Sequence, residues 1–580
     1  MKILMPILFV LLFISACTTK DSNNAPQNKL QVIGWNILTD HTRTALKTID
    51  SSTYYHVNHL QLSHDICHDL RDIKHQWNRN IVNNLTQKAH EIGIPEVVVW
   101  DHALYNLDYY PDRYKQKETG LINLDNPDFW KWFKQDYRKM LDKIPEVDGI
   151  VLTFIETGAR VENQYSEILK TPQEKLAALV DSVASLVVNE RNLKLYIRSF
   201  MYNRTELKNL MECFSLIKCP DIVVMAKETP HDFFVTHPVS WWIQDIPFPV
   251  IIEFDAAHEF NGQGIVASIF PKIHMDRLKH YQKLPNVIGF SIRTDRYGKT
   301  SILGRPSEIN IFAIHETAKN PDIEIEEVIS KFIEERYDSV AVPYLKPVFE
   351  MAPKIILSSF YTLGLNTTNH SKLDFDYRSI YTRHVSGRWM DNPEITVNHG
   401  VNKTFHYWKD IVNHLAPANR KIAEGNNLKE LPEVFENNWI QAEELMDTTY
   451  LNYVIAEKEY GIEMANKAID AVNAAKPFIH DAQKFNILYH TFNRTLLSTR
   501  LRKAYAQVYY GRRIWKRGQD FQNDRLQNII SEGVDNLISI SQEMKNYRRK
   551  GPTGGQYSWV NDADIALELV AEIKNDNILD

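Results

Sequence analysis

Eight short apolar segments, separated by longer amphipathic ones, constrain the fold of this 580-residue chain more than any other feature of its sequence. Each segment is rich in Val, Ile, Phe or Tyr and is apolar almost throughout, as a strand buried on both faces should be. The segments occupy residues 32–38, 56–62, 96–100, 149–154, 193–202, 222–226, 250–255 and 287–293. The pattern therefore predicts eight buried strands.

Helical patterns separate these strands, for example at residues 77–92, 128–143 and 172–189. Strands that alternate with helices pair in parallel through right-handed crossovers, and eight such units in about 265 residues match the size of a closed barrel. An open, doubly wound sheet is the alternative, but no glycine-rich phosphate loop follows the first strand. We predict an α/β fold with a (β/α)8 TIM barrel over residues 31–340.

The N-terminus has the pattern of an export signal. Lys2 precedes an apolar run over residues 3–14, and Ser15, Ala16 and Cys17 follow it. The run is too short to span a bilayer and is typical of a cleaved signal peptide. Its ending resembles a bacterial lipobox, in which Cys17 would become the lipidated first residue; an ordinary signal peptide with a chance cysteine is the alternative. We therefore expect a signal peptide at residues 1–16, a polar tether at 17–30 and an exported lipoprotein of the outer membrane, on its periplasmic or surface face.

Charge and cysteine content exclude several classes of function. The net charge is -6 and no basic tract occurs, which argues against binding to nucleic acid. Cys67, Cys213 and Cys219 remain after Cys17, which is too few for a disulfide framework, and no CxxC pair or histidine cluster accompanies them. We expect neither a metal nor a cofactor.

Ionisable and aromatic residues gather where the predicted strands end, and TIM-barrel enzymes place their chemistry at those ends. We expect contacts with substrate from Trp35, Trp100, Asp101, His102, Arg198, Tyr202, Lys227, Glu253 and Arg293. Glycosidic cleavage needs one protonated carboxyl group and a second carboxylate. The candidates are Glu156, Asp232, Glu253, Asp255 and Glu259. Their positions alone do not assign acid and base, and salt bridges to neighbouring cations are the alternative role for each of them.

Five short motifs resemble those of glycoside hydrolase family 67 α-glucuronidases, in the same order. Residues 227–233 (KETPHDF) resemble the family's K-x-G-P-x-D-F, and residues 251–263 (IIEFDAAHEFNGQ) are similar to its E-F-Q-I-T-Q-E-Y-x-G-Q segment. Residues 198–202 (RSFMY) look like its R-A-F-V-Y strand. Residues 320–328 and 361–365 resemble its N-P-D-x-x-x-E-E-I and P-L-G-L segments. The resemblance covers about residues 145–370.

This resemblance implies roles for five residues. Glu156 would be the general acid, and Asp232 and Glu259 the two candidate bases. Arg198 and Lys227 would hold the carboxylate of a uronic acid, since a guanidinium binds it bidentately and an ammonium adds a point charge. Members of the family invert the anomeric configuration, which requires space for a water molecule and a general acid whose pKa is raised by burial or by neighbouring carboxylates.

The sequence also departs from the family. The β-sandwich that normally precedes the barrel has no counterpart here, Glu228 and Thr229 replace Asn-Gly, and residues 293–297 do not match. These departures leave the exact uronic acid and the rest of the glycan open.

The last third of the sequence is dominated by helical patterns, at residues 439–476 and 489–515. We predict a mainly helical domain over residues 341–580 that packs on the barrel. The resemblance implies that this domain could also form a homodimer.

Three hypotheses for function follow. The first is an exo-acting, inverting hydrolase of the α-glucuronidase type that removes a terminal uronic acid from polysaccharide-derived oligosaccharides. The second keeps the barrel and the acid–base pair but changes the sugar to a galacturonic, neutral or sulfated unit. The third is a surface lipoprotein that binds glycans without catalysis.

Overall fold

The computed structural model describes residues 30–373 and 448–579, apart from residues 155, 202–203, 231, 236–238, 297, 300, 363–364 and 552–556. The predicted signal peptide, Cys17 and Tyr202 therefore lie outside the described residues. Of the helices that are described, none is long and apolar enough to cross a membrane.

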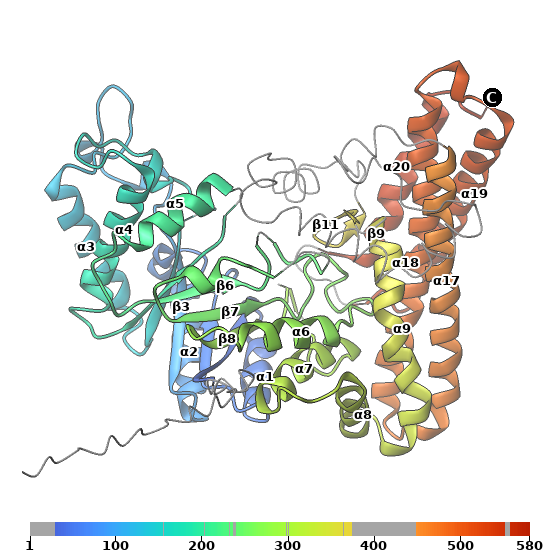
Figure 1. Ribbon diagram of the computed structural model, residues 1–580, viewed down its shortest axis with the longest axis horizontal. Helices are drawn as coiled ribbons and strands as arrows, with labels where there is room; N and C mark the ends of the chain where they lie inside the picture. The colour runs from blue at the N-terminus through green and yellow to red at the C-terminus, as the bar shows by residue number, and fades with distance from the viewer. Residues whose placement is uncertain are drawn as a thin grey trace, which may run out of the picture.

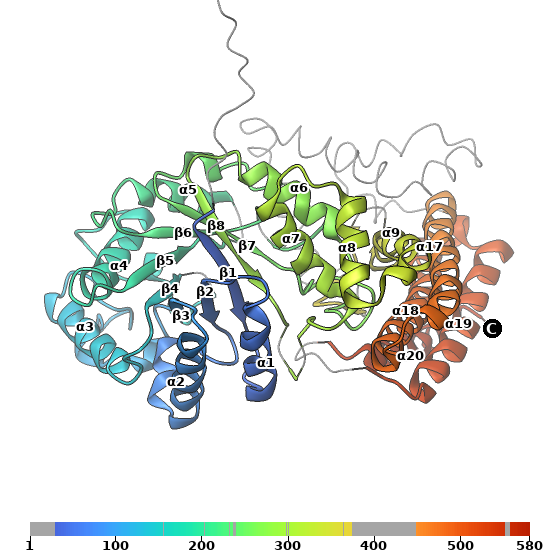
Figure 2. The ribbon, with the colours of Figure 1, turned by 90° about the horizontal axis from the view of Figure 1, so that it is seen from below.

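Eight parallel strands close into a barrel in sequence order, which confirms the predicted fold class (Figures 1 and 2). The strands are β1 (Val32–Ile37), β2 (His59–Leu62), β3 (Glu96–His102), β4 (Gly149–Thr153), β5 (Lys194–Arg198), β6 (Val223–Lys227), β7 (Val250–Phe254) and β8 (Val287–Arg293). Pairing of β1 with β8 closes the ring.

The predicted strand positions are confirmed, and their ends differ by a few residues. The second strand begins at His59 and not at residue 56, because His56 has a φ of 55°, in the left-handed region that a strand cannot include. The third strand continues two residues further, to His102.

Helices surround the barrel on its outside (Figure 2). Local sequence explains where they begin: α4 starts with a capping box formed by Thr171 and Glu174, and Pro172 occupies its first position, where a missing N–H costs nothing. The helices are α1 (Thr42–Ser52), α2 (Gln76–Glu91), α3 (Pro127–Leu141), α4 (Pro172–Val187), α5 (Arg204–Phe214), α6 (Pro271–Tyr281), α7 (Ile309–Lys319) and α8 (Ile325–Arg336).

Alternate residues of each strand fill the inside of the barrel. A buried apolar cluster there is made by Val98, Trp100, Val151, Tyr196, Met225 and Ile251. Because side chains alternate along a strand, residues two positions further on point the same way, toward the mouth at the C-terminal ends of the strands. The cluster therefore forms a floor under the mouth.

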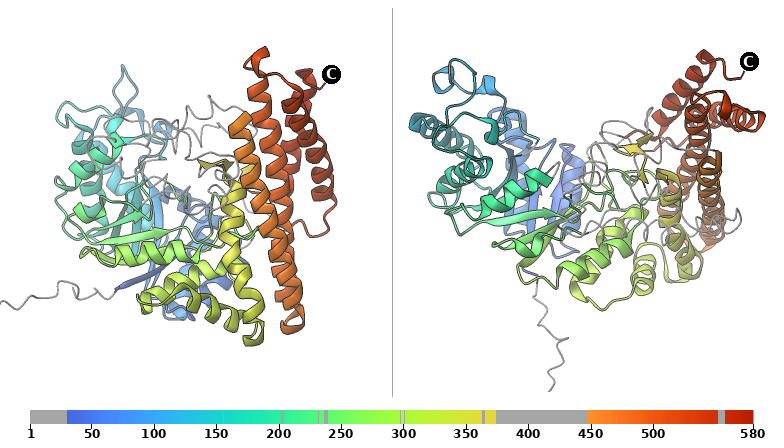
Figure 3. Two further views of the ribbon diagram at one scale, coloured as in Figure 1. Left: turned by 45° about the vertical axis from the view of Figure 1, so that its right-hand side comes forward. Right: turned by 45° about the horizontal axis from the view of Figure 1, so that its top comes forward.

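A helical domain stands beside the barrel in all views (Figures 1 and 3). It consists of α9 (Val342–Phe360), α17 (Thr448–Ala475), α18 (Ala482–Trp515), α19 (Asp524–Asn546) and α20 (Asp562–Asn575). Its helix α18 contacts the loop after β7: the Thr495 hydroxyl accepts a hydrogen bond from the Ala267 N–H at 2.9 Å. This contact ties the helical domain to a loop that also carries mouth residues.

Two small hairpins that the sequence did not predict connect α9 to the rest of the chain. They pair β9 (Tyr361–Thr362) with β10 (Leu365–Asn366), and β11 (Thr368–Asn369) with β12 (Lys372–Leu373). The second hairpin brings His370 to the barrel mouth, as described below.

Close packing of β1 on β8 generates a stability prediction. A Cβ atom on Gly289 would lie 2.1 Å from the Val32 carbonyl oxygen, so Gly289→Ala must open the pairing that closes the barrel. We expect a loss of about 2–3 kcal/mol in the free energy of unfolding, measured by denaturant titration. Ser291→Ala, on the same strand, is the control, because among described residues the Ser291 hydroxyl has no hydrogen-bond partner. Equal stability of Gly289→Ala and wild type would contradict this account.

Candidate active site

Glu253, on β7, lies at the centre of the barrel mouth, between one arginine from β5 and one from β8. Arg198 on β5 donates from Nε to one carboxylate oxygen at 2.8 Å, and Arg293 on β8 donates from Nε to the other, also at 2.8 Å. Burial alone would raise the pKa of Glu253, but the two guanidinium groups outweigh it and lower the pKa to about 2. Glu253 is therefore an ionised group that fixes two arginines.

Glu259, in the loop after β7, is held by two arginines and one histidine. Arg296 bonds to one of its oxygens, His370 Nδ1 lies 2.6 Å from the same oxygen, and Arg293 reaches the other at 3.4 Å. Burial opposes ionisation, yet these neighbours, Arg296 foremost, hold the pKa of Glu259 far below its usual range. A carboxylate with so low a pKa accepts a proton poorly.

Asp232 and Lys227 form a buried ion pair at the end of β6. The Lys227 ammonium donates to Oδ1 of Asp232 at 2.9 Å and lies over the rings of Phe200 and Phe233. Burial lowers the pKa of Lys227, and the Asp232 carboxylate offsets only part of that effect. The Phe233 N–H also donates to Oδ1, at 3.0 Å. Since no described residue hydrogen-bonds to Oδ2, that oxygen is the one available to a ligand.

Asp255 is a buried mouth carboxyl group whose protonated form is favoured by its surroundings. Its Oδ2 accepts a hydrogen bond from the Glu259 N–H at 2.6 Å, whereas its buried Oδ1 has no partner among the described residues. Burial raises its pKa to about 6, against the opposing effect of Arg293.

Other polar atoms of the mouth are also buried without a described partner. They are Asn36 Nδ2 on β1, Thr153 Oγ1 on β4 and Ser291 Oγ on β8. Strand alternation turns all three side chains inward, with Asp255. Buried polar atoms normally have hydrogen-bond partners, so this arrangement suits a ligand with several hydroxyl groups.

Glu156 lies in the loop after β4 and differs from the acid that the resemblance implies. Its φ of 43° is in the left-handed region, a strained backbone conformation for a residue other than glycine. Its side chain is exposed, so the expected burial by the protein is not observed. Glu156 is near enough to His68 to help raise the pKa of that histidine, together with Asp69 and against the effect of burial.

His68, Asp69 and His102 form a cluster beside Glu156. The two imidazole rings stack at 3.9 Å between centroids, His68 Nδ1 lies 2.8 Å from an Asp69 oxygen, and His102 Nδ1 lies 2.6 Å from the His68 carbonyl oxygen. The potential ligand atoms lie within 4.8 Å of one another, as a metal site would need. Hydrogen bonds occupy both Nδ1 atoms, and they account for the arrangement. His102 itself is buried in the mouth wall, where burial lowers its pKa to about 3.

The predictions that Trp35 and Asp101 contact substrate are wrong. Trp35 faces outward from β1, where its indole N–H donates to His315 of α7 at 3.0 Å. Asp101 faces outward from β3 and accepts a hydrogen bond from Tyr137 of α3 at 2.6 Å. The outward orientation of both side chains follows from strand alternation. The inward positions of these two strands belong to Asn36, Trp100 and His102.

Trp100 points inward, but it lies in the floor and not at the surface of the mouth. It is 0% exposed, its indole N–H donates to Gln61 at 3.1 Å, and the Arg198 guanidinium lies 4.8 Å above its ring. It supports Arg198 through a cation–π contact and offers no face to a sugar.

Glu228 is a structural residue of the site that sequence reasoning did not select. It points outward from the end of β6 and binds Arg277 of α6 at 2.9 Å, and its other oxygen accepts the Asp255 N–H at 3.1 Å. It replaces the asparagine of the resembling family and fixes the backbone of Asp255. Arg296 and His370 are further mouth residues that the sequence patterns did not single out.

One of the solved structures that resemble this chain supports the fold, and none assigns a family. A GH138 enzyme targeting pectin rhamnogalacturonan II has a TM-score of 0.55 at 13% identity, covering 95% of this chain and 70% of its own. A Thermobaculum terrenum O-GlcNAc hydrolase has a TM-score of 0.45 at 10% identity, covering 95% and 97%. BtGH115A, a GH115 4-O-methyl-α-glucuronidase with specificity for decorated arabinogalactans, has a TM-score of 0.48 at 8% identity, covering 93% and 62%. No protein-family model and no curated protein matches the sequence.

The pKa of Asp255 generates a prediction on stability. Because the pKa is about 6 in the folded protein and 3.8 ordinarily, the folded state holds the proton more tightly, and stability falls as pH rises from about 4 through 6. Asparagine mimics the protonated form. We therefore expect Asp255→Asn to remove this part of the pH dependence and to be more stable than wild type above about pH 7, by an amount on the order of 3 kcal/mol.

Thermal unfolding of both proteins across this pH range measures the effect. Asp322→Asn, at an exposed position, is the control and should follow the wild-type curve. If the difference between Asp255→Asn and wild type did not change with pH, the assignment of a raised pKa would be refuted.

Proposed function

We propose that this protein is a glycoside hydrolase whose active site is the barrel mouth, and that it removes a terminal uronic acid from polysaccharide-derived oligosaccharides. The observation that carries the proposal is the concentration of paired carboxyl and cationic groups at this mouth, above an apolar floor. A fold shared with a GH138 enzyme supports it.

The charge balance of the mouth favours an anionic sugar. The mouth holds four cations, from three strands and one loop: Arg198, Lys227, Arg293 and Arg296. They face four carboxyl groups, those of Asp232, Glu253, Asp255 and Glu259. When Asp255 is protonated, positive charge is in excess. A buried excess of positive charge attracts a carboxylate strongly, since little water screens it.

The proposed hydrolysis uses two carboxyl groups. Asp232 is the base: Lys227 fixes one of its oxygens, and the other is open to a water molecule that attacks the anomeric carbon. Glu156 is the acid, because its place at the rim lets it reach the glycosidic oxygen of the leaving group. Bound substrate would cover Glu156 and exclude water from it. Inversion follows when water and leaving group lie on opposite faces of the sugar.

For Arg198 we propose a role other than the bidentate contact with the sugar carboxylate that the resemblance implies. Since Glu253 already binds its guanidinium, we propose that Arg198 contributes charge to the mouth, and that Lys227 and Arg296 lie closer to the sugar carboxylate. Glu259 keeps Arg296 in place and is a positioning residue in this scheme.

The remaining sequence-based expectations are part of the proposal. The enzyme would be exported and held at the outer membrane by lipid on Cys17, and the helical domain would provide any homodimer contact. No cofactor takes part in the proposed reaction.

Substitution of the acid and the base tests the mechanism. We expect Glu156→Gln and Asp232→Asn each to lower turnover of uronic-acid-capped oligosaccharides roughly a thousandfold, because each removes a proton-transfer group. Glu167→Gln, in the same loop as Glu156 but hydrogen-bonded to Tyr165, is the control and should retain activity. NMR of the first product should show an inverted anomer.

Two outcomes would contradict the assignment. Full activity of Asp232→Asn would remove the proposed base. Full activity of Glu156→Gln together with loss of activity in Asp255→Asn would transfer the acid role to Asp255, whose pKa already suits it.

A further inference from the structure

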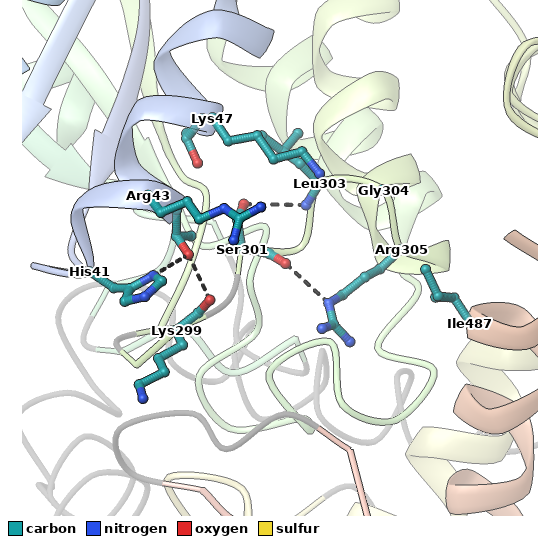
Figure 4. Close-up of a pocket in the computed structure, with 11 residues that line it drawn as sticks. His41, Arg43, Lys47, Lys299, Ser301, Leu303, Gly304, Arg305 and Ile487 are labelled. Atoms are coloured by element: carbon teal, nitrogen blue, oxygen red, sulfur yellow. Dashed lines mark hydrogen bonds between the residues drawn. The ribbon is translucent and has the colours of Figure 1, made fainter. Parts of the chain in front are cut away.

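A second hollow, the cationic pocket, opens beside the mouth between α1 and the loop after β8 (Figure 4). Its volume is about 330 Å³, enough for a sugar unit or its charged substituent. Arg43 and Lys47 enter from α1, Lys299 and Arg305 from the loop after β8, and Ile487 of α18 closes one side.

The described residues that line the cationic pocket include four arginine and lysine side chains and no acidic residue. Arg43, Lys47 and Lys299 are exposed. In the described part of the chain, none of the three forms an ion pair with a carboxylate. Exposed cations are stabilised by water, so these three alone would not require a ligand.

Arg305 is different because it is half-buried. Its Nε donates to the Ser301 carbonyl oxygen at 3.1 Å, and its side chain lies against the loop after β7, with Cδ 3.8 Å from the Cβ position of Gly264. Burial lowers the pKa of Arg305 to about 10. Among described residues it has no carboxylate partner, which is an unfavourable arrangement for an enclosed cation.

A buried arginine near Arg305 strengthens the positive field. Arg494 of α18 is 4% exposed and donates to the Ile265 carbonyl oxygen at 2.8 Å. Burial and the charge of Arg305 together lower its pKa to about 10. Neither arginine has a described acidic neighbour, so the helical domain and the barrel meet at a point of uncompensated positive charge.

The cationic pocket shares two loops with the mouth. The loop after β8 contributes Arg296 to the mouth and Arg305 to the pocket, and the loop after β7 runs from Glu259 in the mouth to Gly264 beside Arg305. A glycan longer than one sugar, with its terminal unit in the mouth, could therefore extend into the pocket.

We propose that the cationic pocket binds a second acidic group of the glycan substrate, a carboxylate or a sulfate, one or more sugars away from the bond that is cleaved. This inference rests on the proposed function and narrows it to a polyanionic glycan. Guanidinium groups bind both oxyanions bidentately, and the ammonium groups add charge at the pocket entrance.

Calorimetric titration of the whole protein with a tetrasaccharide that carries two uronic acids tests the proposal. The same tetrasaccharide with its internal carboxylate methylated, and one with an internal sulfate in its place, separate the two sources of charge. We expect the methyl ester to bind at least about tenfold more weakly than the acid. Arg43→Glu combined with Lys299→Glu should abolish that preference, and Arg305→Lys should weaken it while the protein stays folded.

Lys139→Glu is the matched control: it is an exposed charge reversal on α3, on another side of the barrel, and should leave the preference intact. Equal affinity of wild type for the acid, the sulfate and the methyl ester would overturn the inference, as would an undiminished preference in the Arg43→Glu, Lys299→Glu protein. Hydrolysis without a pocket-dependent preference for the acid over the methyl ester would refute the binding role of the pocket. The proposed function would then still stand. A pocket-dependent preference without hydrolysis would refute the proposed function instead.

Discussion

The buried contact of Glu253 with Arg198 and Arg293 is the interaction on which the rest of the mouth depends. It joins the ends of β5, β7 and β8, and its geometry must be maintained because a single unpaired charge at this depth would cost several kcal/mol. From Arg293 the network continues to Glu259 and thence to Arg296 and His370. Hydrogen bonding through the Glu259 backbone then sets the position of Asp255. A charged scaffold of paired carboxylates and arginines thus holds the mouth together.

Strand positions could be predicted from the sequence because strands buried on both faces are apolar almost throughout, and loops between them are not. The inward or outward direction of each side chain was also predictable in principle. The period-two rule that pairs Glu253 with Asp255 also turns Trp35 and Asp101 away from the mouth, toward His315 and Tyr137. Trp35 and Asp101 both lie near the C-terminal ends of their strands. That position places a residue at the level of the mouth, but it does not decide whether its side chain points into the barrel or away from it.

Other parts of the site could not be predicted because they depend on contacts between distant residues. His370 reaches Glu259 from a hairpin 111 positions away, and no local pattern marks either the hairpin or its partner. The exposure of Glu156 likewise depends on which segments cover the loop after β4. Glu228 stands where the resembling family has asparagine, and only its contacts with Arg277 and the Asp255 backbone show that it supports the site.

Electrostatics connects the mouth and the cationic pocket through one property of arginine. A guanidinium stays charged even when burial lowers its pKa to about 10, as for Arg305 and Arg494, so enclosing it commits the protein to positive charge at that place. In the mouth, Glu253 and Glu259 neutralise most of this charge and thereby become too acidic to exchange protons near neutral pH. Catalysis must then fall to carboxyl groups outside the arginine pairs. This separation of charged scaffold from proton-transfer groups is why the proposed mechanism assigns proton transfer to Asp232 and Glu156.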